Sequence, residues 1–201
     1  MIDICFEKDG AAAGTSAQRL TLFGSERRIT QAQLDQLIDR CNAAIEAIIR
    51  PLTQVSDFRV TGQVDNSFDI VEWTFTLEVG EDTAPLAYLS ARNSGTAVNI
   101  EKLRVANALQ RVGIGATIVK TLRELVEMTG ITTLTTDIAD PGNPLGIKKS
   151  RAGKLLKLPG EGSSAAAAGR MTAFFSKQGF EKYPIFIQKS GMILSLQKKA
   201  P

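Results

Sequence analysis

Histidine is absent from this 201-residue sequence, and cysteine occurs only at Cys5 and Cys41. Without an imidazole, no Ser-His or Cys-His nucleophile and no His-ligated zinc site can form, and two cysteines cannot supply a Cys-only zinc site. We therefore predict no metal site, and a general base has to be a carboxylate, a lysine, a tyrosine or water. Two thiols in a chain of this length favour a reducing, cytoplasmic setting over a disulfide framework.

Long apolar runs are also missing. No stretch of about 18 or more apolar residues is present, so no membrane span is predicted. The first residues, Met1-Ile2-Asp3-Ile4-Cys5, lack the basic region and the long apolar stretch of a signal peptide. We therefore expect no membrane partner.

The net charge is small, and the composition is that of a folded domain. A formal charge of +3 does not by itself indicate a nucleic-acid partner. With 43% hydrophobic and 22% charged residues, the chain can bury one core. Its length predicts one domain over residues 1–201.

Two stretches have strong helical periodicity. The first begins at Thr30, which forms a predicted capping box with Gln33, and ends at Pro51. Its apolar residues lie at helical spacing: Leu34, Leu37, Ile38, Cys41, Ile45, Ile48 and Ile49. The second spans about residues 113–129, and Gly130 suits its left-handed C-cap position. Its predicted buried stripe is Ile114, Ile118, Leu122, Leu125 and Val126. A third helix is predicted for about residues 164–178.

The remaining regular segments have the composition of strands. The predicted strands cover residues 2–6, about 20–22, 58–64, 68–79, 86–92, 96–105, 132–139, 183–188 and 192–197. The predicted hairpin turns are Asp65-Asn66-Ser67, Asn93-Ser94-Gly95 and Lys189-Ser190-Gly191. Residues 58–105 would thus form an antiparallel meander of about four strands, and the predicted class is α+β with one mixed sheet.

The most informative motif is the glycine-containing loop Arg111-Val112-Gly113-Ile114-Gly115-Ala116, which lies between a predicted strand and the second helix. A helix start offers unpaired N–H groups and a partial positive charge, both of which suit an anion. Glycines let the backbone approach a phosphate closely and adopt dihedral angles that other residues avoid. The loop therefore predicts binding of a diphosphate.

Other interpretations of this loop were weighed. A Walker A loop requires glycine before Lys120-Thr121, and Val119 stands there. A dinucleotide fingerprint requires a third glycine where Ile118 stands, although Asp137 does end the next strand. The glycines could also serve only tight packing of the helix.

Three segments together resemble the GNAT family of N-acetyltransferases. The family signature, Gln/Arg-x-x-Gly-x-Gly/Ala, matches Gln110-Arg111-Val112-Gly113-Ile114-Gly115. The preceding strand, ending in Leu103-Arg104-Val105, looks like the family's central strand. Ala173-Phe174-Phe175-Ser176-Lys177-Gln178-Gly179-Phe180 is similar to its second motif. The resemblance covers roughly residues 58–198.

This resemblance implies a fold and a coenzyme. The fold would be a mixed, largely antiparallel sheet of six to seven strands with about three to four helices, splayed between the central strands. The coenzyme would be acetyl-CoA as co-substrate, with its diphosphate on the loop. The residues that the resemblance assigns to it are Leu103, Arg104, Val105, Gln110, Arg111, Val112, Gly113, Ile114, Gly115, Ala116 and Asn143.

The resemblance also implies where the chemistry takes place. The thioester and an amine would meet where strands 96–105 and 132–139 splay apart, and an unpaired strand amide would bind the thioester oxygen. An alkyl amine with a pKa of about 10.4 must lose a proton before it attacks. Glu101 and Asp137 lie on the two strands and are the candidate general bases. The alternative, that each is an ordinary solvated or ion-paired strand residue, stays open.

The sequence departs from the family pattern at Phe175. The family usually has a tyrosine there that protonates the departing thiolate, and phenylalanine cannot donate a proton. A thiolate with a pKa of about 8.5 needs little help to leave, and water, Tyr183 or Tyr88 could replace the tyrosine.

A second departure is a basic insertion at residues 141–162. Its basic residues are Lys148, Lys149, Arg151, Lys154 and Lys157. It is predicted to contact an anionic acceptor surface or to be a solvated loop. Its lack of aromatic residues argues against base stacking on nucleic acid.

The predicted function is transfer of an acetyl group from acetyl-CoA to a primary amine of an unidentified acceptor, a small molecule or a protein. The alternatives are a non-catalytic acyl-CoA-binding module and a nucleic-acid-directed member of the fold. The oligomeric state cannot be predicted, and a dimer is one option.

Overall fold

The computed structural model describes residues 19–137, 167–185 and 189–196. These residues form a seven-stranded mixed sheet in the order β3-β4-β5-β6-β7-β9-β8 and a separate two-stranded ribbon, β1-β2. The sheet strands are β3 Arg59–Ser67, β4 Ile70–Val79, β5 Asp82–Asn93, β6 Val98–Val105, β7 Thr133–Asp137, β8 Glu181–Ile185 and β9 Lys189–Ser195. All neighbouring strands of this sheet are antiparallel except β6 and β7, which are parallel. The α+β class with one mixed, largely antiparallel sheet is thus confirmed.

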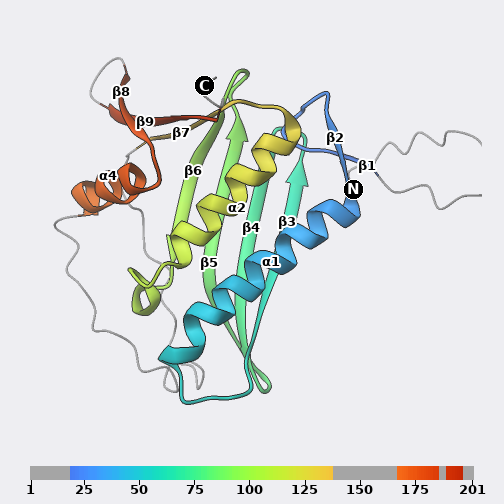
Figure 1. Cartoon of the computed structure of the whole chain (residues 1–201), viewed down its shortest axis with the longest axis vertical. Helices are drawn as coiled ribbons and strands as arrows, with labels where there is room; N and C mark the ends of the chain where they lie inside the picture. Colours follow the sequence, from blue (N-terminus) through green and yellow to red (C-terminus); the bar gives the residue numbers. More distant parts are fainter. Residues whose placement is uncertain (1–18, 138–166, 186–188, 197–201) are drawn as a thin grey trace, which may run out of the picture.

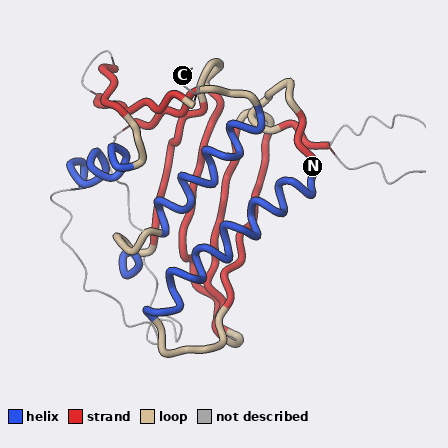
Figure 2. The backbone as a smooth tube through the Cα atoms, in the orientation of Figure 1, coloured by secondary structure: helices blue, strands red, loops and turns tan. Residues whose placement is uncertain are grey.

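The other elements are β1 Arg19–Thr21, β2 Arg28–Thr30, α1 Gln31–Ile49, η1 Arg50–Leu52, η2 Asn107–Leu109, α2 Ile114–Thr129 and α4 Ala167–Lys177. Helices α1 and α2 lie side by side across one face of the sheet (Figures 1 and 2). No helix among the described residues is long and apolar enough to cross a membrane.

Helix α1 forms for the reasons visible in its sequence. The Thr30 hydroxyl accepts a hydrogen bond from the Gln33 amide, and the Gln33 side chain accepts one from the Thr30 amide. This capping box satisfies donors that a helix start otherwise leaves unpaired. The buried residues are Leu34, Leu37, Cys41, Ile45 and Ile49, which pack into the core beneath the helix.

Helix α2 also matches its prediction. It begins after Gly113 and ends at Gly130, and both glycines have a positive φ, of 110° and 81°. The stripe predicted for it is buried throughout. Burial of these apolar side chains at roughly 25 cal/mol per Å² of removed surface is the main force that holds α2 on the sheet.

The sheet has one apolar and one polar face. In β4, Trp73, Phe75 and Leu77 are buried in the core under α1 and α2. Successive side chains of a strand point to opposite faces, so Glu72 and Thr74 lie on the face turned away from these helices. That polar face carries part of the site described below.

Two predicted turns were wrong. Asp65-Asn66-Ser67 belongs to β3, where these residues pair with Glu72, Val71 and Ile70, and the chain reverses at Phe68-Asp69. Polar residues are tolerated there because β3 is an edge strand. Lys189-Ser190-Gly191 belongs to β9, where it pairs with β8. Residues 2–6 and the insertion at 141–162 lie outside the described residues.

Candidate functional site

Strands β6 and β7 pair over only a short length. Their register joins Val98 to Leu134, Asn99 to Thr135 and Ile100 to Thr136. At the end of this ladder the Thr136 hydroxyl donates to the Ile100 carbonyl at 3.2 Å. Strand β6 then continues to Val105 without a described partner on this side. Figure 1 shows β7 beside one end of β6 only. The splay predicted between the central strands is therefore present.

A β-bulge lies where the splay begins. Opposite β5, Ser90 pairs with Lys102 and Ala91 pairs with Ile100, so Glu101 is the extra residue of β6. A bulge bends its strand and strengthens the local twist. It thus turns the rest of β6 out of line with β7.

The unpaired half of β6 presents backbone amides to the splay. Beyond its end, the Ala106 amide donates to the Leu86 carbonyl of β5 at 2.9 Å. Because amide directions alternate along a strand, the amides of Val105 and Leu103 point the other way, toward the open edge. Their side chains pack against the core. Donors fixed in this manner can stabilise an oxyanion.

The strand end is tied directly to the glycine-containing loop. The Gln110 side-chain amide donates to the Val105 carbonyl at 3.2 Å and to Asn107 Oδ1 at 3.0 Å. Gln110, predicted as a coenzyme contact, thus has a bracing role within the protein. Asn107 was missed by sequence reasoning, because nothing in the sequence shows that its side chain meets that of Gln110.

The loop has two residues in the left-handed region of φ. Arg111 has φ 68° and Gly113 has φ 110°, whereas the φ of Val112 is not positive. Such alternation turns successive N–H groups toward one concavity, the arrangement called a nest. The Arg111 side chain is exposed and has no ion-pair partner among the described residues.

Helix α2 begins just behind this loop. The first bond of the helix is from the Thr117 amide to the Gly113 carbonyl, at 3.0 Å. The preceding amides, of Ile114, Gly115 and Ala116, therefore remain without helical acceptors, as at any helix start. The Ile114 side chain is buried in the core, so Ile114 can contribute only its amide to a ligand.

The two loop glycines differ in what they allow. A Cβ on Gly113 would meet Ile48 of α1 at 3.6 Å, an ordinary contact, but its φ of 110° strains any L-residue. A Cβ on Gly115 would meet the Phe174 ring at 3.5 Å and Val105 at 3.6 Å. Gly113 is thus required by the backbone conformation, whereas Gly115 marks a close contact between α2, α4 and β6.

Phe174 and its neighbours form an aromatic cluster beside the helix start. Phe174 and Phe175 meet edge to face with centroids 5.0 Å apart, as do Phe175 and Phe180. Phe175, at the position where the GNAT resemblance implies a tyrosine, is only 1% exposed. Phe175 and Phe180 belong to the core, while Phe174 and Met171 are half-buried against it.

The two candidate bases lie at the start of the splay. The last pair between β6 and β7 is Ile100 with Thr136. Glu101 and Asp137 are the next residues of these two strands. Asp137 ends β7 opposite Gly191 of β9, and its side chain is not described. The register of β6 and β7 thus places the backbones of Glu101 and Asp137 next to each other at the start of the splay.

Glu101 is already engaged in an ion pair. Its carboxylate accepts a hydrogen bond from Arg92 Nε at 2.9 Å and lies 3.5 Å from the Ser90 hydroxyl. Arg92 also pairs with Asp69 at 3.3 Å. These contacts are those expected under the alternative that Glu101 is an ion-paired strand residue. Asn143, the remaining predicted contact, lies outside the described residues.

Buried Cys41 is not a reactive group. Burial between α1 and α2 raises the pKa of its thiol to about 11, and the nearby Glu124 carboxylate acts in the same direction. A hydrogen bond with Thr121 lowers the pKa only in part. The thiol therefore stays protonated at neutral pH and cannot act as a nucleophile.

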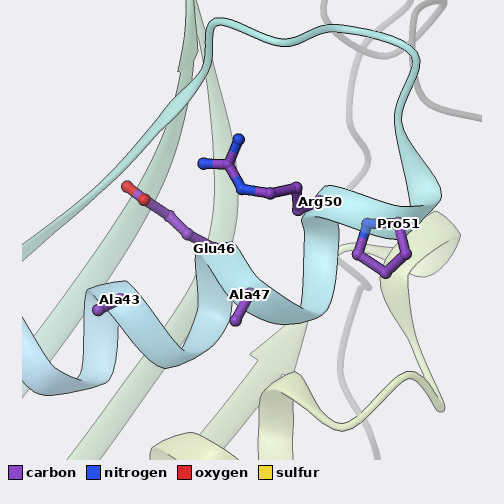
Figure 3. A pocket seen from close by; sticks show the side chains of 5 residues that line it. All are labelled: Ala43, Glu46, Ala47, Arg50 and Pro51. Carbon is purple, nitrogen blue, oxygen red and sulfur yellow. The ribbon is translucent and has the colours of Figure 1, made fainter.

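A shallow groove of about 520 Å³ lies at the C-terminal end of α1 (Figure 3). It is lined by Ala43, Glu46, Ala47, Arg50 and Pro51. Its two charged side chains have structural partners: Glu46 accepts a hydrogen bond from the Val60 amide at 2.9 Å, and the Arg50 guanidinium lies over the Phe58 ring, 5.0 Å from its centroid. The groove thus offers no uncommitted charged group.

The fold is GNAT-like in its strand order, its splay and its loop-to-helix connection. No family model and no curated protein matches the chain. Solved structures that resemble it include the PaiA N-acetyltransferase from Thermoplasma acidophilum in complex with coenzyme A, at TM-score 0.41 and 11% identity. That match covers 63% of this chain and 61% of the PaiA chain, so this chain spans less than two thirds of the PaiA protein.

Two further solved structures are similarly distant. A domain from Methanocaldococcus jannaschii has TM-score 0.45 and 13% identity, covering 85% of this chain and 96% of that one. The ribosomal-protein-S18-alanine N-acetyltransferase from Escherichia coli has TM-score 0.36 and 17% identity, covering 63% and 70%.

Proposed function

We propose that this chain binds acyl-CoA and transfers the acetyl group of acetyl-CoA to a primary amine. The observation that carries the proposal is the junction of two sets of backbone donors without partners in the described part of the chain, the loop amides ahead of α2 and the β6 amides at the splay. Gln110 joins the two sets. A diphosphate at the loop would place a thioester arm along Leu103 and Val105, as the GNAT resemblance implies.

The reaction would proceed by direct attack. The amine loses its proton to a carboxylate, directly or through water, and its nitrogen then attacks the thioester carbon. The C–N bond forms while the β6 amides hold the developing oxyanion. The nitrogen then gives up its second proton to water, and the C–S bond breaks to release a thiolate. Glu101 and Asp137 are the candidate bases. If Glu101 serves, Glu101→Gln should lower kcat about 10²- to 10⁴-fold.

A second candidate function is acyl-CoA binding without turnover. Phe175 favours it, since this buried ring carries no proton for the thiolate. Tyr88 is a poor replacement, because burial and its hydrogen bond to Glu72 raise its pKa above 10.0. Release of free thiol from acetyl-CoA with a panel of primary amines separates the two functions, and the transferase requires amine-dependent release. The nucleic-acid hypothesis stays a prediction, because the insertion lies outside the described residues.

Coenzyme binding is tested by calorimetric titration and by thermal shift. CoA and acetyl-CoA should stabilise the chain by about 2.7 kcal/mol at a hundredfold excess over Kd, whereas NADH and ATP should not. Gly113→Ala should lose this stabilisation because an alanine resists φ 110° and alters the nest.

The matched control is Gly95→Ala. Gly95 has φ 94° in the β5–β6 turn, and a Cβ there meets nothing within 4 Å. It should therefore have a similar backbone strain, of about 1–2 kcal/mol, and keep the response to CoA. Equal responses in the two variants would refute the loop assignment.

A further inference from the structure

The polar face of the sheet carries a shallow basic hollow of about 340 Å³. It is lined by Thr74, Pro85, Ala87, Tyr88, Lys102 and Arg104. Tyr88 pairs with Thr74 on one side and with Arg104 on the other, so three adjacent strands contribute to it. The hollow lies on the opposite face from α1 and α2, and the glycine-containing loop does not line it.

The two cations of this hollow are uncommitted. Among the described residues, neither Lys102 nor Arg104 forms an ion pair, whereas Arg92 on the same face forms two. Lys102 is exposed and Arg104 is half-buried. They are two residues apart on β6, so their side chains start roughly 7 Å apart on one face. One carboxylate or phosphate group can contact both.

Two acids of the same face have other hydrogen-bond or ion-pair partners. The Tyr88 hydroxyl donates to the Glu72 carboxylate, which is thus engaged by a neutral partner. Glu101, the other acid on this part of the face, is paired with Arg92. The Thr74 hydroxyl also lines the hollow and can donate to an anion there, whereas the Tyr88 proton is already donated to Glu72.

The hollow adjoins the splayed edge. Lys102 and Arg104 flank Leu103, whose amide points to the edge where the thioester would lie. We propose that Lys102 and Arg104 bind an anionic group of the acceptor, so that the preferred substrate is a primary amine that also carries a carboxylate or a phosphate. The role of this anion site in selecting an acceptor rests on the proposed function, whereas anion binding by Lys102 and Arg104 is independent of it.

The first test is kinetic and uses amines of similar basicity. Thiol release from acetyl-CoA is measured with butylamine, 4-aminobutyrate and O-phosphoethanolamine. We expect kcat/KM for the anionic amines to exceed that for butylamine by about tenfold or more, the effect of one charge-assisted hydrogen bond. Arg104→Gln and Lys102→Gln should each reduce this ratio. A preference for carboxylate over phosphate, or the reverse, identifies the anion.

The matched control is Arg59→Gln. Arg59 is exposed on β3, opposite Glu78 of β4 in the strand register, and β4 and β5 separate β3 from β6, which carries Lys102 and Arg104. The Arg59→Gln change removes the same charge and should keep the wild-type preference. Equal loss in all three variants would mean a general charge effect and would overturn the inference, as would a wild-type ratio near one.

The second test measures the anion site without turnover. Inorganic phosphate and acetate are titrated into the wild-type chain at constant ionic strength, and binding is followed by calorimetry. Affinity should fall in Arg104→Gln and Lys102→Gln and persist in Arg59→Gln and Gly113→Ala. Loss in Gly113→Ala alone would place the anion at the loop and overturn the inference.

The two tests separate the inference from the proposed function. If CoA binds but anions neither bind at the hollow nor select the acceptor, the inference fails and the transferase stands. If the anion site is found but CoA does not bind, the proposed function fails and the site stands.

Discussion

The two halves of β6 share a strand but not an environment. Residues Val98–Ile100 lie between β5 and β7, and the Thr136 hydroxyl donates to the Ile100 carbonyl at the end of this segment. Residues 102–105 keep β5 as a partner but have no β7 partner. Among the described residues, the second half therefore has no strand that binds its backbone donors on the side of β7. The difference shows how one bulge residue, Glu101, can divide a strand into a segment paired on both sides and a segment paired on one side.

The largest effect on this comparison should come from a truncation in the paired half. Leu134 pairs with Val98 and is fully buried, so Leu134→Ala should lower the free energy of unfolding by about 2–5 kcal/mol. Leu103, in the open half, is only half-buried, and Leu103→Ala should cost less. Urea denaturation of both variants measures the difference. Similar losses would mean that the open half is as tightly packed as the paired half.

Proline substitutions should produce the next largest effect. The Arg104 amide points to β5, so Arg104→Pro removes a ladder bond and should cost about 1–3 kcal/mol of stability. The Val105 amide points to the open edge, so Val105→Pro should lose only the stability that the Val105 side chain contributes by packing. Val105→Ala measures that packing contribution. The rate of thiol release by Val105→Pro should fall about 10²- to 10³-fold, the loss typical of one oxyanion donor. Equal destabilisation by both prolines would contradict the assigned amide directions.

The smallest effect concerns the boundary between the halves. Thr136→Val removes the hydroxyl that donates to the Ile100 carbonyl and should cost about 0.5–1.5 kcal/mol. Hydrogen exchange should accelerate at the amides next to Ile100. Thr135→Val is the comparison, because its hydroxyl bonds the half-buried Asn99 side chain at 3.1 Å and should matter less. A larger change in Thr135→Val would show that the Thr136 bond does not hold the boundary.

Local signals in the sequence predicted much of this fold. Thr30 and Gln33 predicted the start of α1, and Gly113 and Gly130 predicted both ends of α2, because caps depend on neighbouring residues only. The strand β2 was missed, since three residues carry too little periodicity. The turn at Phe68 was misplaced because Asp65-Asn66-Ser67 has turn composition, whereas pairing with β4 decides the outcome.

The candidate site was predicted in outline but not in its contacts. The order of strand, loop and helix was predicted from the motif, and Arg111 and Gly113 in the loop have positive φ. The bulge at Glu101, the ion pair with Arg92 and the bracing role of Gln110 depend on residues distant in the sequence or on side-chain geometry. In the sequence, the basic hollow is indicated by the two cations Lys102 and Arg104, which alternate with Leu103 along one strand.

The hydrogen bond from Gln110 to Val105 would couple binding of the two ends of a coenzyme thioester. Because one side chain connects the loop to the end of β6, fixing the nucleotide portion of a thioester would also fix the edge that receives its acyl end. Binding energy from a remote part of a substrate can be realised in the transition state. An acetyl-pantetheine fragment without the nucleotide should then lose turnover as well as affinity, and Gln110→Ala should make the full coenzyme behave more like the fragment.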